Sequence, residues 1–191
     1  MLTSALVFLI DTAASLLTIA LVLRFYLQWA RAAHRNPVAD FVNALTNFAV
    51  LPVRRVIPGL WGLDLATLLL AWLVQLAALF LELQLKGFQF GPAAGQSIVA
   101  MLLLAAVLLA RIGLYVLIFV VIVQAVVSWV NPYSPIAPTL NALTRPFLRP
   151  FQRVIPTVAN VDLSPLALIV VCQLLLMVPV AYLETALARM I

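Results

Sequence analysis

Pro37-Val-Ala-Asp-Phe-Val-Asn-Ala-Leu-Thr46 recurs as Pro135-Ile-Ala-Pro-Thr-Leu-Asn-Ala-Leu-Thr144. The similarity continues without a gap, through R-V-I-P and D-L, to Gln75 in the first copy and Gln173 in the second. Equivalent positions lie 98 residues apart, which is the difference between Pro135 and Pro37. The chain is therefore a tandem repeat, and we expect its two halves to share one structure.

The composition predicts that both copies lie in a lipid bilayer. Hydrophobic residues make up 66% and charged residues 9% of the 191 residues, which is more apolar than a soluble domain of this size. A helix needs roughly 20 mainly apolar residues to cross a bilayer. We predict an all-α membrane protein with four transmembrane helices in two tandem parallel repeats, residues 1–90 and 91–191. The expected spans are Leu2 to Trp29, Leu65 to Leu85, Ser97 to Trp129 and Ser164 to Leu187.

The distribution of charge predicts the orientation of these spans. The two loops inside the repeats, residues 30–63 and 130–162, carry with their flanks eight arginines and three aspartates, whereas the other side has three basic and three acidic residues. Short loops rich in Lys and Arg stay in the cytoplasm. We therefore expect both loops to be cytoplasmic and both termini to face the other side. The N-terminus lacks a basic leader and a convincing cleavage site, so the first span is expected to be retained.

Both loops are apolar and rich in proline. In the first, Phe41, Leu45 and Phe48 recur at helical spacing, which predicts a short amphipathic helix at the membrane surface. The second loop repeats this stripe, but Pro146 and Pro150 are expected to cut its helix short. A re-entrant segment, covered by protein, is the alternative for both loops.

A basic turn follows each amphipathic segment. It contains Arg54 and Arg55 in the first copy and Arg149 and Arg153 in the second, with prolines on both sides. Guanidinium groups match the geometry of phosphate, so one interpretation is binding of phospholipid headgroups. The other interpretation is that these charges only set the orientation of the chain.

One aspartate precedes the second span of each repeat. Asp64 and Asp162 are expected to cap the helices that follow them. An additional interpretation pairs Asp64 with Arg55 and Asp162 with Arg153, which would hold each basic turn against the start of the next helix.

Four polar residues fall within or beside the apolar spans. Gln75 and Gln173 each follow the loop aspartate by eleven residues, about 16 Å at helical rise, which places them near the bilayer midplane. They either bond to a neighbouring helix or line a polar path or ligand site. Asp11 and Arg111 lie near the opposite interface, where they either anchor their own helices or form an ion pair between the repeats.

The sequence contains no pattern of residues typical of catalysis. There is one cysteine, Cys172, in an apolar segment, and one histidine, His34, without an acidic cluster nearby. Neither suits a metal site, and no Gly-rich phosphate loop or paired nucleophile is present. We predict no enzyme activity, no cofactor and no metal. The basic residues lie beside membrane spans, so they predict anionic phospholipid, and not nucleic acid, as the partner.

The basic turns and the aspartate motifs also carry a family resemblance. The order of a span ending in Trp, then R-R-V-I-P or Q-R-V-I-P, then D-L-A or D-L-S-P before the next span, resembles the YggT family of bacterial integral membrane proteins. The resemblance covers both copies and implies the bacterial inner (plasma) membrane. It implies a link to osmotic shock tolerance, and for related proteins to cell division, nucleoid distribution and assembly of membrane complexes. It supplies no catalytic residues.

Two functions are consistent with this sequence. The first is a non-enzymatic protein that supports membrane organisation or membrane-protein assembly, with anionic lipid bound at its arginine turns. The second is a small oligomeric channel or transporter for ions or small solutes, with Gln75 and Gln173 along its path. The first is favoured because no charge is expected at the midplane. A homo-oligomer or other membrane proteins are the further partners considered.

Overall fold

The computed structural model describes residues 1–31, 37–56, 64–88, 94–155 and 162–191. His34, Pro58 and Pro156 lie outside the described residues. Within these ranges all regular structure is helical. The elements, in chain order, are α1 (Leu2–Trp29), α2 (Pro37–Val56), α3 (Leu65–Leu85), α4 (Ala94–Val130), α5 (Ala137–Gln152), α6 (Ser164–Leu175), the π-helical η1 (Leu176–Val180) and α7 (Ala181–Ala188).

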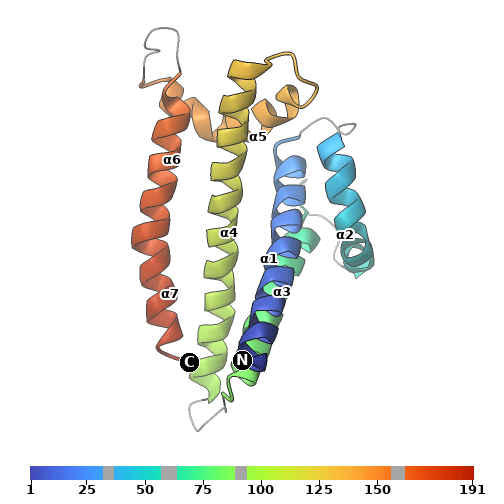
Figure 1. Ribbon diagram of the computed structural model, residues 1–191, viewed down its shortest axis with the longest axis vertical. Helices are drawn as coiled ribbons and strands as arrows, with labels where there is room; N and C mark the ends of the chain where they lie inside the picture. The colour runs from blue at the N-terminus through green and yellow to red at the C-terminus, as the bar shows by residue number, and fades with distance from the viewer. Residues whose placement is uncertain (32–36, 57–63, 89–93, 156–161) are drawn as a thin grey trace.

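Four of the described helices are long and apolar enough to cross a membrane. They are α1, α3, α4 and the continuous helix formed by α6, η1 and α7, in agreement with the four predicted spans. Both chain ends lie at the same end of the molecule (Figure 1). The fold class is therefore the predicted one, and each half contributes one pair of antiparallel spans.

The first pair, α1 and α3, is joined by both apolar and polar contacts. Leu21 and Ala71 pack together with Val50 of α2 in one buried cluster. Beside it, the amide nitrogen of Gln75 donates to the hydroxyl of Thr18 at 2.8 Å. Gln75 is therefore a buried interhelical hydrogen-bonding residue, which was one of the two interpretations of this position.

The second glutamine is placed differently. Gln173 is exposed on α6 and has no hydrogen-bond partner among the described residues. The position on α4 that corresponds to Thr18, counted from the Trp29 and Trp129 pair, is Ile118, which cannot accept a hydrogen bond. The two glutamines follow their loop aspartates at the same distance in the sequence, but they lie in two different environments.

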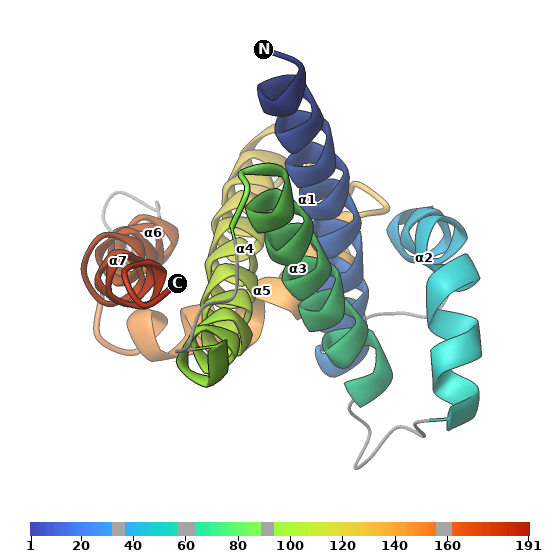
Figure 2. The same ribbon diagram turned by 90° about the horizontal axis from the view of Figure 1, so that it is seen from below.

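α4 is the central helix of the fold. It packs against α1 and α3 on one side and against α6, η1 and α7 on the other (Figure 2). One buried cluster joins Val116 and Val120 of α4 to Val22 of α1. Another joins Val121 of α4 to Leu168 of α6. The two repeats are therefore connected mainly through this helix.

α5 crosses the end of α4 and continues through two prolines. The expectation that Pro146 and Pro150 would shorten this helix is wrong, because it extends to Gln152. Both prolines are exposed, whereas Leu143 and Leu148 on the same helix are buried against α4. Packing of these leucines therefore outweighs the loss of one backbone hydrogen bond at each proline.

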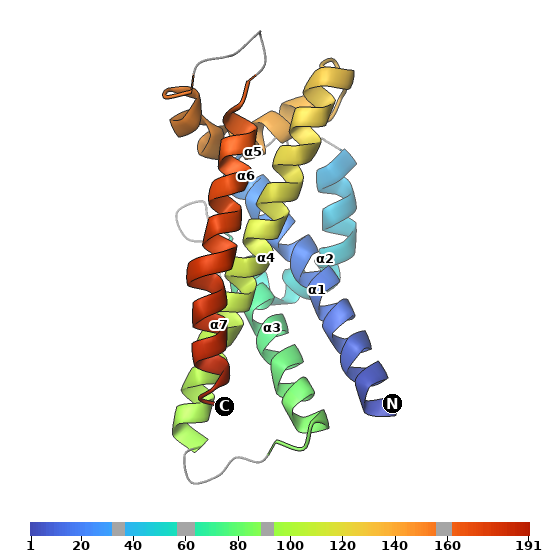
Figure 3. The same cartoon turned by 60° about the vertical axis from the view of Figure 1, so that its left-hand side comes forward.

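The two helices between the spans, α2 and α5, lie beside the spans instead of extending from their ends. α4 has 37 residues, about 55 Å at helical rise, and exceeds the roughly 30 Å of the hydrocarbon core. Its end stands beyond the level at which α5 crosses it (Figure 3). α2 runs back along α1 and bends along its length (Figure 2), as expected for a helix that contains Pro52.

The two glutamines give a matched test of helix packing. Replacing Gln75 with Leu removes the hydrogen bond to Thr18 and should lower the free energy of unfolding by about 1 kcal/mol. Gln173→Leu, at the equivalent position, should cause no loss because Gln173 bonds to no described residue. Unfolding of the purified protein in mixed micelles, followed by circular dichroism, measures both. Equal destabilisation would contradict the assigned environments.

Candidate functional site

The loop of the first repeat is closed by a polar contact between α2 and the start of α3. Nε of Arg54 donates to Oδ2 of Asp64 at 3.2 Å, and a terminal nitrogen of Arg54 donates to Gln28 of α1 at 2.9 Å. Asp64 is the N-cap of α3 and accepts from the backbone N–H of Thr67 at 3.2 Å. The structure thus pairs Asp64 with Arg54, one residue before the expected Arg55.

The second repeat closes its loop with an uncharged donor. Gln152, the equivalent of Arg54, donates to Oδ2 of Asp162 at 2.9 Å. Asp162 also accepts from the backbone N–H of Ser164 at 2.8 Å. The expected partner, Arg153, is exposed and makes no ion pair with any described residue. The prediction that Asp162 caps the following helix is wrong, because the N-cap of α6 is Leu163. The two repeats therefore share a contact between equivalent residues, but they differ in its charge and in the capping bond.

Both loop aspartates favour the ionised form. Burial opposes ionisation of Asp64, but hydrogen bonds from Arg54 and Thr67 outweigh it, so the pKa of Asp64 is below its ordinary value. Burial also opposes ionisation of Asp162, and hydrogen bonds from Ser164 and Gln152 lower the pKa of this carboxyl. Both groups are therefore carboxylates at neutral pH.

Arg24 makes a buried contact between α1 and α2 that sequence reasoning missed. It lies on α1, is only 7% exposed, and donates to Oγ1 of Thr46 at 2.7 Å and to Oδ1 of Asn47 at 2.9 Å. These bonds hold α2 against α1. In the second repeat Gln124 donates to Asn141 at 3.2 Å. A polar residue near the end of the first span, together with the repeated N-A-L-T motif, was the signal for this contact.

Other loop arginines are free to bind a ligand. Arg55, Arg145, Arg149 and Arg153 are exposed and make no ion pair with any described residue. We call them the four exposed loop arginines. Arg54, by contrast, is engaged with Asp64. Of the four arginines predicted to bind headgroups, three are therefore available and one is structural.

α2 presents an apolar surface beside this charge. Phe41, Phe48 and Leu51 are among its exposed large side chains, whereas Val42, Thr46 and Val50 are buried against the protein. A helix that buries one stripe on its own protein and exposes a second apolar stripe suits the headgroup and acyl boundary of a membrane. Arg55, in its last turn, would then lie at the level of lipid phosphates.

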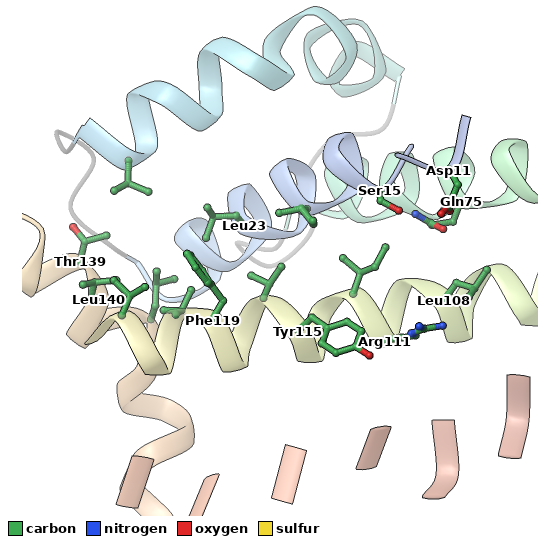
Figure 4. A pocket seen from close by; sticks show the side chains of 17 residues that line it. Asp11, Ser15, Leu23, Gln75, Leu108, Arg111, Tyr115, Phe119, Thr139 and Leu140 are labelled. Carbon is green, nitrogen blue, oxygen red and sulfur yellow. The ribbon is translucent and has the colours of Figure 1, made fainter. Parts of the chain in front are cut away.

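A cavity of about 730 Å³ separates α1 from α4. Asp11, Ser15 and Gln75 gather at one end of it, with Arg111 across from them on α4, while Leu140 of α5 lies at the other end (Figure 4). Gln173 does not line this cavity. The two glutamines therefore do not face one shared path within the chain.

Arg111 pairs within its own repeat. Its Nη1 lies 3.1 Å from Oε2 of Glu184 on α7, and its guanidinium stands 5.7 Å from the centre of the Tyr115 ring. The ion pair between Asp11 and Arg111, one of the two interpretations of these residues, is not formed, and Asp11 makes no hydrogen bond or ion pair with a described residue. Glu184 is the nearer partner because α7 packs directly on α4.

Comparison with known proteins identifies the family. The model of the CCB3/YggT family matches residues 3–85 and again residues 101–183. The chain belongs to this family. The two matches to the CCB3/YggT model coincide with the two copies of the repeated sequence.

Relatives in this family are bacterial proteins described as uncharacterized. The chain is 37% identical to YggT of Escherichia coli over 168 residues, which cover 87% of this chain and 84% of that protein. It is 34% identical to a protein of Pseudomonas aeruginosa over 167 residues, covering 86% and 83% of the two chains. No solved structure matches the chain.

The contact that closes the first loop can be tested by making it resemble the second. Arg54→Ala leaves the buried carboxylate of Asp64 without its cation and should lower the free energy of unfolding by about 2 kcal/mol. Arg54→Gln introduces the residue found at the equivalent position 152, and should cost about half as much. Unfolding of purified variants in detergent measures both. A result in which Gln is no better than Ala would contradict the proposed equivalence of the two contacts.

The same pair predicts a dependence on pH. Because the folded-state pKa of Asp64 is lowered, its stabilisation is complete above the unfolded-state pKa of about 3.9 and is lost as pH falls through the folded-state value. Arg54→Gln should reduce this loss in acid. Unfolding measured between neutral pH and about pH 3 tests the expectation, and an unchanged acid dependence would contradict it.

Proposed function

We propose that this chain is a non-enzymatic protein of the bacterial inner membrane that binds anionic phospholipid and thereby supports membrane organisation or membrane-protein assembly. Tolerance of osmotic stress is the physiological setting that the resemblance to YggT proteins suggests. The observation that carries the proposal is that some arginines make contacts within the protein while others remain exposed and unpaired. Arg54 and Arg24 are used to hold the fold, while the four exposed loop arginines have no partner in the described chain.

The position of these arginines favours lipid over a soluble ligand. They lie on or directly after α2 and α5, the two helices between the spans, and α2 exposes apolar side chains next to Arg55. Such a helix binds the membrane through apolar burial and electrostatic attraction to anionic lipid together. Each basic residue near an anionic surface contributes about 1 kcal/mol. Loops 30–63 and 130–162 would then face the cytoplasm, because short loops rich in Lys and Arg stay on that side of the membrane.

Osmotic stress would act on such a protein through the membrane itself. Swelling stretches the bilayer and changes the lateral spacing of headgroups, to which an interfacial helix with a bound lipid responds. A protein that binds lipid headgroups of one leaflet at two sites, one in each repeat, would oppose an increase in the spacing between those headgroups. In this role the protein needs neither a catalytic group nor a continuous polar path.

Replacement of the exposed arginines tests the proposal. The triple variant Arg55→Gln, Arg149→Gln and Arg153→Gln should lose roughly 3 kcal/mol of attraction to anionic lipid. We expect the wild-type protein, purified from mixed vesicles, to retain more phosphatidylglycerol than phosphatidylcholine. The triple variant should lose this enrichment. The retained lipid is extracted and quantified after purification. High salt should weaken the wild-type preference in the same direction.

Two matched variants control this experiment. Arg54→Gln removes a loop arginine that is already paired with Asp64 and should leave lipid enrichment nearly unchanged. Arg189→Gln removes an exposed arginine at the other end of the molecule and should also have no effect. Equal enrichment in the triple variant and the wild type would exclude lipid binding by these residues. Insertion of every variant in the same orientation is verified by protease accessibility.

The transport alternative predicts flux of ions or small solutes through the protein, whereas the lipid-binding proposal predicts none. Gln75 is bonded to Thr18 and Gln173 lies on an outer surface, so one chain does not place them along one path. Liposomes that contain the folded protein should therefore show no flux of ions or small solutes above empty liposomes under an osmotic gradient. Flux that disappears in the Gln75→Leu, Gln173→Leu double variant would instead establish a channel, built from more than one chain.

A further inference from the structure

The cavity between α1 and α4 has the size and lining of a ligand site. Its volume of about 730 Å³ falls within the roughly 300–1,000 Å³ typical of small-molecule sites. Apolar side chains line most of it, and polar groups are concentrated at one end (Figure 4). The apolar lining includes Ile19 and Leu23 of α1, Val116 and Phe119 of α4, and Leu140 of α5.

The cavity is long enough for one acyl chain. α4 lines it from Leu108 to Val123, which are fifteen residues apart, about 22 Å at helical rise. One leaflet occupies half of the roughly 30 Å hydrocarbon core, about 15 Å. The cavity therefore exceeds the depth of one leaflet and can accept one acyl chain along its full length.

The cavity is also accessible from the side. Ile19, Tyr115 and Phe119 line it and are 41%, 48% and 66% exposed. All three lie within membrane-spanning helices, so the surface that they expose faces acyl chains. A lipid can enter laterally between α1 and α4 without passing through water.

The polar end carries an unbalanced negative charge. Asp11 has no hydrogen-bond or ion-pair partner in the described chain, and the Ser15 hydroxyl lies one turn further along α1. Arg111 across the cavity is already paired with Glu184, so the carboxylate of Asp11 is left without a counter-ion. Asp11 is exposed, so its carboxylate at the polar end of the cavity is accessible to a charged group of a ligand, and an opposite charge there forms a charge-assisted hydrogen bond. The ligand that complements this end therefore carries a positive group.

We infer that the cavity binds one phospholipid with a primary-ammonium headgroup, of the phosphatidylethanolamine class. The ammonium pairs with Asp11, and one acyl chain extends past Ile19 and Val116 toward Leu140. Glu184 contacts only Nη1 of Arg111, so the phosphate accepts from Nη2 of the same guanidinium. Asp11 is eighteen residues before Trp29, about 27 Å along α1. The headgroup thus lies in the leaflet opposite the four exposed loop arginines, and this site is separate from the anionic-lipid sites proposed above.

Binding of defined lipids to the full chain tests the inference. The protein is purified in detergent and titrated with phosphatidylethanolamine or phosphatidylglycerol, and bound lipid is counted by native mass spectrometry. Asp11→Asn should weaken binding of phosphatidylethanolamine about tenfold, because a charge-assisted hydrogen bond is lost. Binding of phosphatidylglycerol should not change. Asp40→Asn removes an exposed carboxylate on α2 and serves as the charge control.

A second pair of variants tests the acyl chain. Ile19→Trp fills the cavity from α1 and should abolish binding of phosphatidylethanolamine, whereas Leu16→Trp makes the same change at an exposed position that does not line it. The triple arginine variant should still bind phosphatidylethanolamine. Thermal unfolding of each variant without added lipid shows whether it remains folded.

Three results would overturn the inference. Phosphatidylethanolamine that binds equally to the wild type and Asp11→Asn would exclude the carboxylate as its partner. Equal behaviour of Ile19→Trp and Leu16→Trp would exclude the cavity as the binding site. A change of oligomeric state in Ile19→Trp would show that a second copy of the chain, and not lipid, occupies the cavity.

Discussion

Hydrogen bonds between polar side chains hold the two short helices, α2 and α5, beside the membrane-spanning helices. Arg24 joins α1 to the middle of α2, and Arg54 joins the last turn of α2 to the start of α3, so α2 is fixed at two points along its length. Within a bilayer, lipid chains are as apolar as leucine, and apolar burial alone does little to select one neighbour. Directional bonds supply that selection. The positions of the exposed arginines and of the cavity wall both follow from it.

The spans were predictable because the bilayer imposes a length and a composition that hydropathy detects. The side-chain contacts between the helices could not be predicted in this way. Arg54 and Arg55 are adjacent in the sequence, and only the direction in which the last turn of α2 faces decides which of them meets Asp64. Gln75 and Gln173 occupy equivalent positions, yet only Gln75 faces an acceptor on the preceding span. These outcomes depend on the rotation of helices about their axes.

Prolines and long-range partners were further sources of difference. Pro146 and Pro150 lie on the exposed side of α5, where the missing N–H groups do not oppose the packing of Leu143 and Leu148. Glu184 becomes the partner of Arg111 because α7 returns along α4. Neither feature is visible in local sequence. The pairing of Arg111 with Glu184 leaves Asp11 without an ion-pair partner among the described residues, and this determines the charge at the polar end of the cavity.

The two chain ends share one end of the molecule, and each repeat contains an even number of crossings. A second copy added to the first therefore enters the membrane in the same orientation, with no need to reverse the charges of its loops. A protein formed by duplication of one such unit could therefore insert into the membrane without further changes of sequence. The two halves now differ in sequence while both keep the contact, with arginine at position 54 and glutamine at the equivalent position 152.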